Sequence, residues 1–136
     1  MSDQAHTATI LYVEDEELNR TLLRAVLQRA PDPRLRSASL IEARTLGQAR
    51  VILTEQPIDL VLLDVRLPDG SGLDLVREIK SRDPALGVVV MSASVLPAER
   101  EEAVRAGCDA FVAKPYVPGE LLATLHRILA TAPTDD

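Results

Sequence analysis

Polar side chains follow four short apolar runs of the sequence, at the point where each run ends. Glu14 and Asp15 follow the first run, Asp64 the second, Ser92 the third and Lys114 the fourth. If the runs are parallel strands, their carboxyl ends meet at one edge of a sheet, where ligands bind in such folds. We therefore expect these carboxylates, the hydroxyl and the ammonium group to lie close together, although they are far apart in the sequence.

This combination of side chains suits phosphoryl transfer. Neighbouring carboxylates repel each other and titrate together, and a divalent cation relieves that repulsion. Mg²⁺ prefers a few carboxylate oxygens and keeps several waters. An aspartate beside the metal can act as a nucleophile and form an aspartyl phosphate, whose added negative charge needs cations and hydrogen-bond donors around it. In this hypothesis Mg²⁺, Ser92 and Lys114 supply those partners.

Each of these residues has a simpler interpretation when it is taken alone. Glu14 and Asp15 could be acids favoured in the first turn of a helix, and Asp64 could begin a turn. A serine at a strand end often bonds to the backbone, and a lysine is usually solvated, so Ser92 and Lys114 are also ambiguous. The functional interpretation therefore depends on their convergence.

Strand-like and helix-like patterns alternate five times along the chain. Alternation at this spacing predicts a single α/β domain, with a doubly wound five-stranded parallel sheet flanked by five helices. The strands are expected at Thr9–Val13, 36–43, 60–64, 88–92 and 110–113. The helices are expected from Glu16 to before Pro31, from Thr45 to before Pro57, at 72–82, from Pro97 to before Gly107, and from Pro118 to about residue 130.

Two details of the helices are specific enough to test. On the first helix, an apolar stripe is expected to face the core, formed by Leu18, Leu22, Leu23, Val26 and Leu27. At the start of the second helix, Thr45 and Gln48 have the spacing of a capping box.

Composition excludes several classes of protein. The net charge is −6 and both signs are interspersed, which argues against direct binding of nucleic acid. No apolar run is long enough to span a membrane, and the N-terminus lacks the pattern of a signal peptide. The single cysteine, Cys108, cannot form an internal disulfide. We expect a cytoplasmic protein with a domain at residues 9–130 and flexible ends at 1–8 and 131–136.

The sequence resembles the receiver domains of bacterial two-component response regulators, the CheY-like family. The resemblance covers about residues 9–130. It rests on four motifs in this order: Ile-Leu-Tyr-Val-Glu-Asp-Glu, Asp-Leu-Val-Leu-Leu-Asp-Val-Arg-Leu-Pro-Asp-Gly-Ser-Gly-Leu, Val-Val-Val-Met-Ser-Ala and Ala-Gly-Cys-Asp-Ala-Phe-Val-Ala-Lys-Pro-Tyr. It implies a flavodoxin-like fold with the strand order 2-1-3-4-5.

The resemblance also implies a role for each residue of the site. Asp64 would accept a phosphoryl group from a sensor histidine kinase or a histidine phosphotransfer protein. Asp15, Asp64 and the backbone carbonyl of Arg66 would ligate Mg²⁺, and Glu14 would hold the metal through water. Lys114 would pair with Asp64 at rest and with the phosphoryl group afterwards.

Further positions correspond to the parts of a switch. Ser92 would move toward the phosphoryl group, Phe111 would be the aromatic switch residue, and the bond between Lys114 and Pro115 would be cis. Three positions depart from the commonest family pattern. Glu14 replaces an aspartate, Ser92 replaces a threonine, and Phe111 lacks the hydroxyl of a tyrosine.

By the same resemblance, the protein is a phosphorylation switch and not an enzyme, because its chemistry is limited to its own phosphorylation and dephosphorylation. The responding face would be formed by helix 98–106, strand 110–113 and the last helix. It would bind an unknown downstream protein or a second copy of the chain in a homodimer. We expect a single domain without a DNA-binding output domain.

Three other functions remain open at this stage. A hydrolase with an aspartate nucleophile usually has a second acid two positions later, where this chain has Arg66. A flavodoxin-like redox carrier would need a phosphate-binding loop after the first strand and flanking aromatic residues. A receiver-like protein that binds partners without phosphorylation would lack Asp64, Asp15 or Lys114, and all three are present.

Overall fold

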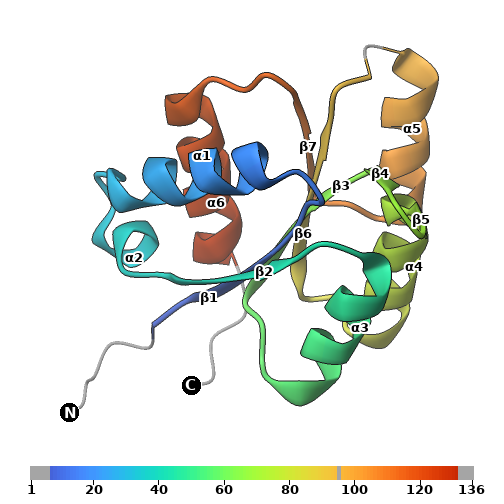
Figure 1. Cartoon of the computed structure of the whole chain (residues 1–136), viewed down its shortest axis with the longest axis horizontal. Helices are drawn as coiled ribbons and strands as arrows, with labels where there is room; N and C mark the ends of the chain where they lie inside the picture. Colours follow the sequence, from blue (N-terminus) through green and yellow to red (C-terminus); the bar gives the residue numbers. More distant parts are fainter. Residues whose placement is uncertain (1–6, 95, 132–136) are drawn as a thin grey trace.

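A five-stranded parallel sheet forms the centre of the molecule (Figure 1). A computed structural model describes residues 7–94 and 96–131. The strand order is β2-β1-β3-β6-β7, which is the predicted order 2-1-3-4-5 because β4 (Arg66–Leu67) and β5 (Gly70–Ser71) form a separate small hairpin. The strands of the main sheet are β1 (Thr9–Val13), β2 (Ser39–Ala43), β3 (Leu60–Asp64), β6 (Gly87–Ser92) and β7 (Ala110–Ala113).

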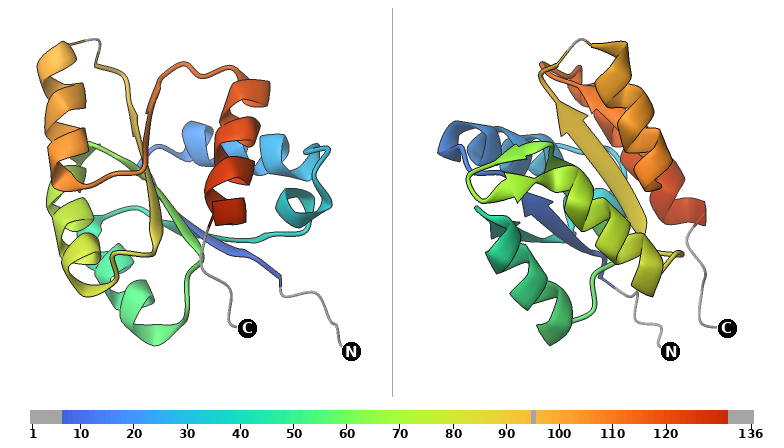
Figure 2. Two further views of the ribbon diagram at one scale, coloured as in Figure 1. Left: turned by 180° about the vertical axis from the view of Figure 1, so that it is seen from behind. Right: turned by 90° about the vertical axis from the view of Figure 1, so that its right-hand side faces the viewer.

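Helices cover both faces of this sheet (Figures 1 and 2). They are α1 (Glu17–Gln28), α2 (Pro33–Arg36), α3 (Leu46–Glu55), α4 (Gly72–Arg82), α5 (Pro97–Ala106) and α6 (Pro118–Thr131). Residues of α1, α2 and α6 pack in one core with one face of the sheet, and residues of α3, α4 and α5 pack in another with the opposite face. The doubly wound α/β fold predicted from the sequence is therefore confirmed.

The central strands carry continuous apolar runs because both of their faces are buried. Leu60, Val61, Leu62 and Leu63 of β3 are all inaccessible to solvent. Their side chains alternate between the two cores, since Val61 and Leu63 lie with α3, α4 and α5, while Leu60 and Leu62 lie with α1, α2 and α6. The register pairs Asp64 with the next-to-last residue of β6, so the carboxyl ends of these strands are level.

The short helix α2 was not expected. Among the described residues there are six helices, because Pro33–Arg36 forms one turn where the sequence analysis placed a connection and the start of the second strand. Asp32 caps this turn by accepting a hydrogen bond of 2.9 Å from the amide of Arg34, and Pro33 occupies the first helical position. The strand consequently begins at Ser39 and not at residue 36.

The predicted apolar stripe of α1 is wrong in part. Leu18 and Leu22 are 70% and 49% exposed, whereas Arg20 is 5% exposed. The Arg20 guanidinium lies 3.2 Å from Glu42 Oε1 and donates to the backbone carbonyl of Glu14 at 2.9 Å. These polar contacts turn the helix so that Arg20 faces inward, and the two leucines face solvent.

The start of α3 has more partners than a capping box supplies. Thr45 accepts a hydrogen bond from the Gln48 amide at 3.0 Å, as predicted. The Gln48 side chain, however, accepts a bond from the amide of Arg44 and not from that of Thr45. Asp69, which lies between β4 (Arg66–Leu67) and β5 (Gly70–Ser71), accepts bonds from the next two amides of α3, at 2.9 and 3.0 Å. The hairpin after β3 is therefore attached to α3.

The predicted flexible ends lie mostly outside the described residues, which exclude 1–6, 95 and 132–136. Ala8 is buried and Thr131 is the last residue of α6. Within the described ranges, no helix is long and apolar enough to cross a membrane.

Candidate functional site

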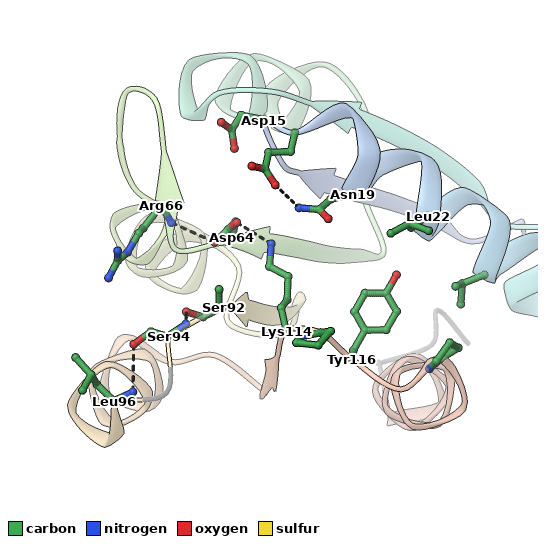
Figure 3. Close-up of a pocket in the computed structure, with 15 residues that line it drawn as sticks. Asp15, Asn19, Leu22, Asp64, Arg66, Ser92, Ser94, Leu96, Lys114 and Tyr116 are labelled. Carbon is green, nitrogen blue, oxygen red and sulfur yellow. Dashed lines mark hydrogen bonds and ion pairs between the residues drawn. The ribbon is translucent and has the colours of Figure 1, made fainter.

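A cleft of about 920 Å³ opens at the carboxyl ends of the strands (Figure 3). Asp15, Asp64, Arg66, Ser92 and Lys114 line it, so the structure brings these predicted site residues together from four strand ends. The remainder of its wall comes largely from α1 and from the segment between β7 and α6, and includes Asn19, Leu22, Val26, Pro115, Tyr116 and Pro118.

An ammonium group shared by two carboxylates is the main electrostatic feature of the cleft. Lys114 Nζ lies 2.8 Å from Asp64 Oδ2 and 2.9 Å from Glu14 Oε1. Glu14 is 1% exposed and also accepts bonds from the Tyr12 hydroxyl at 3.3 Å and from the Glu16 amide at 3.1 Å. Glu14 thus binds Lys114 from the buried side of the cluster and is not among the residues that line the cleft.

The pKa values of this cluster favour the charged forms. Burial alone would raise the pKa of Glu14, but the hydrogen bonds from Lys114 and the Glu16 amide outweigh it and lower the pKa. Burial would likewise lower the pKa of Lys114, but its bonds to Asp64 and Glu14 raise the pKa instead. An ionised Glu14 and a cationic Lys114 therefore accompany Asp64 at neutral pH.

Asp15 lies at the exposed rim of the same cleft (Figure 3). Within the described part of the chain, no group of three acidic, histidine or cysteine side chains is arranged to hold a metal ion. Asp15 and Asp64 are the strand-end carboxylates that line the cleft, and Asp64 Oδ1 accepts a bond of 3.2 Å from the Arg66 amide. Two carboxylates, a backbone carbonyl and water form a donor set that fits Mg²⁺.

Ser92 is held by a residue that the sequence analysis did not single out. Its hydroxyl donates to the Glu99 carboxylate and accepts a bond of 3.0 Å from the Ser94 amide. Glu99 lies in the first turn of α5, and its other oxygen is 3.7 Å from the Arg66 guanidinium. An acid seven positions after a strand-end serine, in the first turn of the following helix, was the only sequence signal for this contact.

Phe111 and Pro115 belong to the strand and loop beside the cleft. Phe111 packs against the core formed with α3, α4 and α5, and the Arg100 guanidinium carbon lies 5.7 Å from its ring centroid. Phe111 does not line the cleft. The bond between Lys114 and Pro115 is cis.

Gly72 allows α4 to pack closely against the end of β3. The sequence did not indicate this role, because Gly72 stands in a motif rich in turn residues. A Cβ atom at this position would lie 2.1 Å from the carbonyl oxygen of Asp64 and 2.6 Å from Leu63 Cδ1. The helix α4 can therefore begin directly against the end of β3 only because residue 72 has no side chain.

Comparison with known proteins agrees with this geometry. The family model described as "Response regulator receiver domain" matches residues 10–126. The response regulator protein PilR of Pseudomonas aeruginosa is 40% identical over 121 residues, which are 87% of this chain and 26% of PilR. The chain thus spans about a quarter of that relative.

Solved structures show the same fold. A response regulator receiver protein from Pseudomonas putida is 30% identical with a TM-score of 0.79, and the match covers 90% of this chain and 98% of that one. The beryllofluoride-activated NtrC4 receiver domain dimer is 26% identical with a TM-score of 0.82, covering 92% and 98%. The fold, the residues at the strand ends and these matches together show that the chain belongs to the receiver domain family of two-component response regulators.

Proposed function

We propose that this receiver domain accepts a phosphoryl group on Asp64 in a Mg²⁺-dependent reaction. The donor is a histidine kinase or a histidine phosphotransfer protein, and phosphorylation alters the face formed by α5, β7 and α6 for partner binding. The observation that carries the proposal is the contact of 2.8 Å between the Lys114 ammonium and Asp64 Oδ2 at the base of an open cleft. A carboxylate beside a fixed cation in an accessible cleft suits the acceptance of an anionic group.

Each residue has a definite task in this reaction. An Asp64 oxygen forms the new P–O bond while the P–N bond to the donor imidazole breaks, and the imidazole leaves with the bonding electrons. Lys114 is placed to offset the added charge, and buried Glu14 keeps it in position. Asp15, Asp64 and the carbonyl of Arg66 would hold Mg²⁺, which would supply further positive charge near the phosphoryl oxygens. Ser92 and Phe111 are the switch residues.

The protein in this proposal is a substrate of its own chemistry and not an enzyme for other molecules. It carries out only its phosphorylation and dephosphorylation, and the signal leaves through a downstream protein or a homodimer. The NtrC4 receiver, which is a dimer in its beryllofluoride-activated form, supports the second route. On this chain, the proposed face presents Val104 of α5, which is 60% exposed.

Intact-protein mass spectrometry tests the proposal. We expect the protein to gain the mass of one phosphoryl group from acetyl phosphate when Mg²⁺ is present, and not in EDTA. The Asp64→Asn variant should gain none. Asp74→Asn is the matched control, because Asp74 is an exposed acid of α4 paired with Arg77. No gain in the wild type, or a gain that persists in Asp64→Asn, contradicts the proposal.

A further inference from the structure

The contact between Ser92 and Glu99 occupies the only proton that the serine hydroxyl can donate. A hydroxyl has a single donor hydrogen and two acceptor lone pairs. In this structure the hydrogen goes to the Glu99 carboxylate, and one lone pair accepts the Ser94 amide. Ser92 is 3% exposed, so water cannot readily replace either partner. Ser92 therefore cannot donate to a group on Asp64 without leaving Glu99.

We propose that Glu99 is a positioning residue that holds the Ser92 hydroxyl away from Asp64 and competes with the phosphoryl group for its proton. The proposal rests on the function proposed above. A phosphoryl group carries strong acceptor oxygens and about two negative charges, so it can displace a carboxylate as the partner of a hydroxyl. The balance between the two acceptors then sets how much of the protein is in the switched form.

The same carboxylate contacts a second residue of the cleft. Arg66, which follows the phosphoacceptor by two positions, lies 3.7 Å from Glu99 Oε2, and its side chain is 77% exposed. Because that guanidinium is solvated, the ion pair is weak and Arg66 can turn toward a phosphoryl group at little cost. Glu99 would then lose both partners in one event.

Loss of these partners would remove contacts that hold the start of α5 in position. The N-cap of this helix, Leu96, makes no side-chain capping bond, and Glu99 is the acid of its first turn. Among the described contacts, those of Glu99 connect the start of α5 to Ser92 and Arg66. Release of Glu99 would thus convert a chemical change at Asp64 into a movement of α5.

The first test measures beryllofluoride binding, by ¹⁹F NMR at saturating Mg²⁺, in wild type and variants. We expect Glu99→Ala to lower the Kd for beryllofluoride about tenfold, since a hydrogen bond to a charged acceptor is removed from the competing state. Glu99→Gln, which keeps a neutral acceptor, should lower the Kd by a smaller factor. Glu101→Ala is the matched control, because Glu101 is an exposed acid of the same helix and should leave the Kd unchanged.

A double variant separates positioning from charge. In the Ser92→Ala background, Glu99→Ala should change the Kd much less than in the wild type, because there is no hydroxyl to compete for and only the weak ion pair with Arg66 is lost. If Glu99→Ala tightens binding equally in both backgrounds, Glu99 acts only by electrostatic repulsion and the inference is overturned. The inference also fails if Glu101→Ala has the effect of Glu99→Ala, or if Glu99→Ala leaves the Kd at the wild-type value.

The second test needs neither metal nor phosphoryl mimic in the variants. In metal-free protein, the amide resonance of Ser94 reports on the Ser92 hydroxyl to which it donates. We expect Glu99→Ala to shift this resonance toward its position in beryllofluoride-bound wild type, and Glu101→Ala to leave it in place. An unshifted resonance in Glu99→Ala contradicts the inference. Wild-type protein that binds no beryllofluoride with Mg²⁺ would instead contradict the function proposed for Asp64.

Discussion

At the scale of single residues, the position of Lys114 in the cleft depends on Glu14, an acid that is almost entirely buried. Glu14 is 1% exposed and remains charged because Lys114 Nζ lies 2.9 Å away. Breaking a buried ion pair by removing one partner usually costs more than the pair contributes, because the remaining charge is left without compensation. Lys114 therefore stabilises the fold as well as the proposed phosphorylated state.

We predict that Lys114→Met destabilises the metal-free protein by about 3 kcal/mol at pH 7. In the wild type the pKa of Glu14 is lowered, so its contribution is present above its ordinary value of 4.5 and is lost as pH falls through the lower folded-state pKa. In the variant burial still raises the pKa of Glu14 while the hydrogen bond from Lys114 that opposes it is gone, so the folded-state pKa is higher than in the wild type. Protonation of Glu14 as the pH falls then removes the uncompensated buried charge. Urea unfolding from pH 7 to 4 should show the gap between the two proteins narrowing.

The variant Glu14→Gln/Lys114→Met is the control for this prediction. It carries no charge at either position, so its stability at pH 7 should exceed that of Lys114→Met alone. A gap that widens as the pH falls would contradict the assignment of Glu14 as the buried, uncompensated group.

At the scale of elements, the site requires α4 to start against the end of β3. A Cβ at residue 72 would meet a backbone carbonyl at 2.1 Å, and backbone cannot move aside as a flexible side chain can. We predict that Gly72→Ala lowers the free energy of unfolding by about 1 to 3 kcal/mol and reduces phosphoryl acceptance, because Asp64 must shift. Urea denaturation and intact mass measure the two effects.

Gly119 provides the comparison for that variant. It lies in α6, and apart from its chain neighbours and the nearby backbone of its own helix, no atom of the described residues comes within 4 Å of the position that an added Cβ would occupy. Gly119→Ala should therefore be neutral or stabilise the protein by up to about 1 kcal/mol. An equal loss of stability in both variants would mean that the loss at residue 72 does not come from its close packing against β3.

The sequence predicted the elements where one physical effect dominates. Val88, Val89 and Val90 could only be a buried strand, and Gly107, with φ of 107°, ends α5 as predicted. Prediction failed where contacts between polar groups far apart in the sequence determine which way a side chain or an element faces. Arg20 is turned inward by Glu42, which is 22 positions away, and no local periodicity contains that contact. The local sequence around Asp69 indicates only a turn, because its partners belong to α3.

The candidate site likewise has features that the sequence predicted and features that it did not. Strand ends brought Asp64, Ser92 and Lys114 together as the alternating pattern implied. The pattern could not tell that Glu14 would face Lys114 and that Asp15 would face the open cleft, because adjacent side chains after a strand differ only in which way they point. Glu99 was missed because its contact joins the end of one element, β6, to the first turn of another, α5, and no local pattern contains both.

At the scale of the whole molecule, we predict that beryllofluoride with Mg²⁺ promotes a homodimer through α5, β7 and α6. Val104→Glu should prevent it, since the exposed valine would be replaced by a charge within the interface. Sedimentation velocity measures the fraction of dimer.

Val51→Glu is the control for this experiment. Val51 is also exposed, at 53%, but it lies on α3 and outside the proposed face. A dimer that forms equally well in Val104→Glu would exclude this face, and a dimer that is lost in both variants would show that the loss is not specific to it.

The attachment of Asp69 to α3 makes the molecule asymmetric about its cleft. On one flank, backbone amides of α3 donate to Asp69 of the hairpin after β3, and Gly72 allows α4 to pack directly against the end of β3. On the other flank, α5 is linked to the cleft by side chains whose partners can be exchanged. The flank with α3 and α4 is held by backbone contacts, whereas the flank with α5 is held by side-chain contacts. We therefore expect a conformational change that begins at Asp64 to displace α5 and to leave α3 and α4 in place.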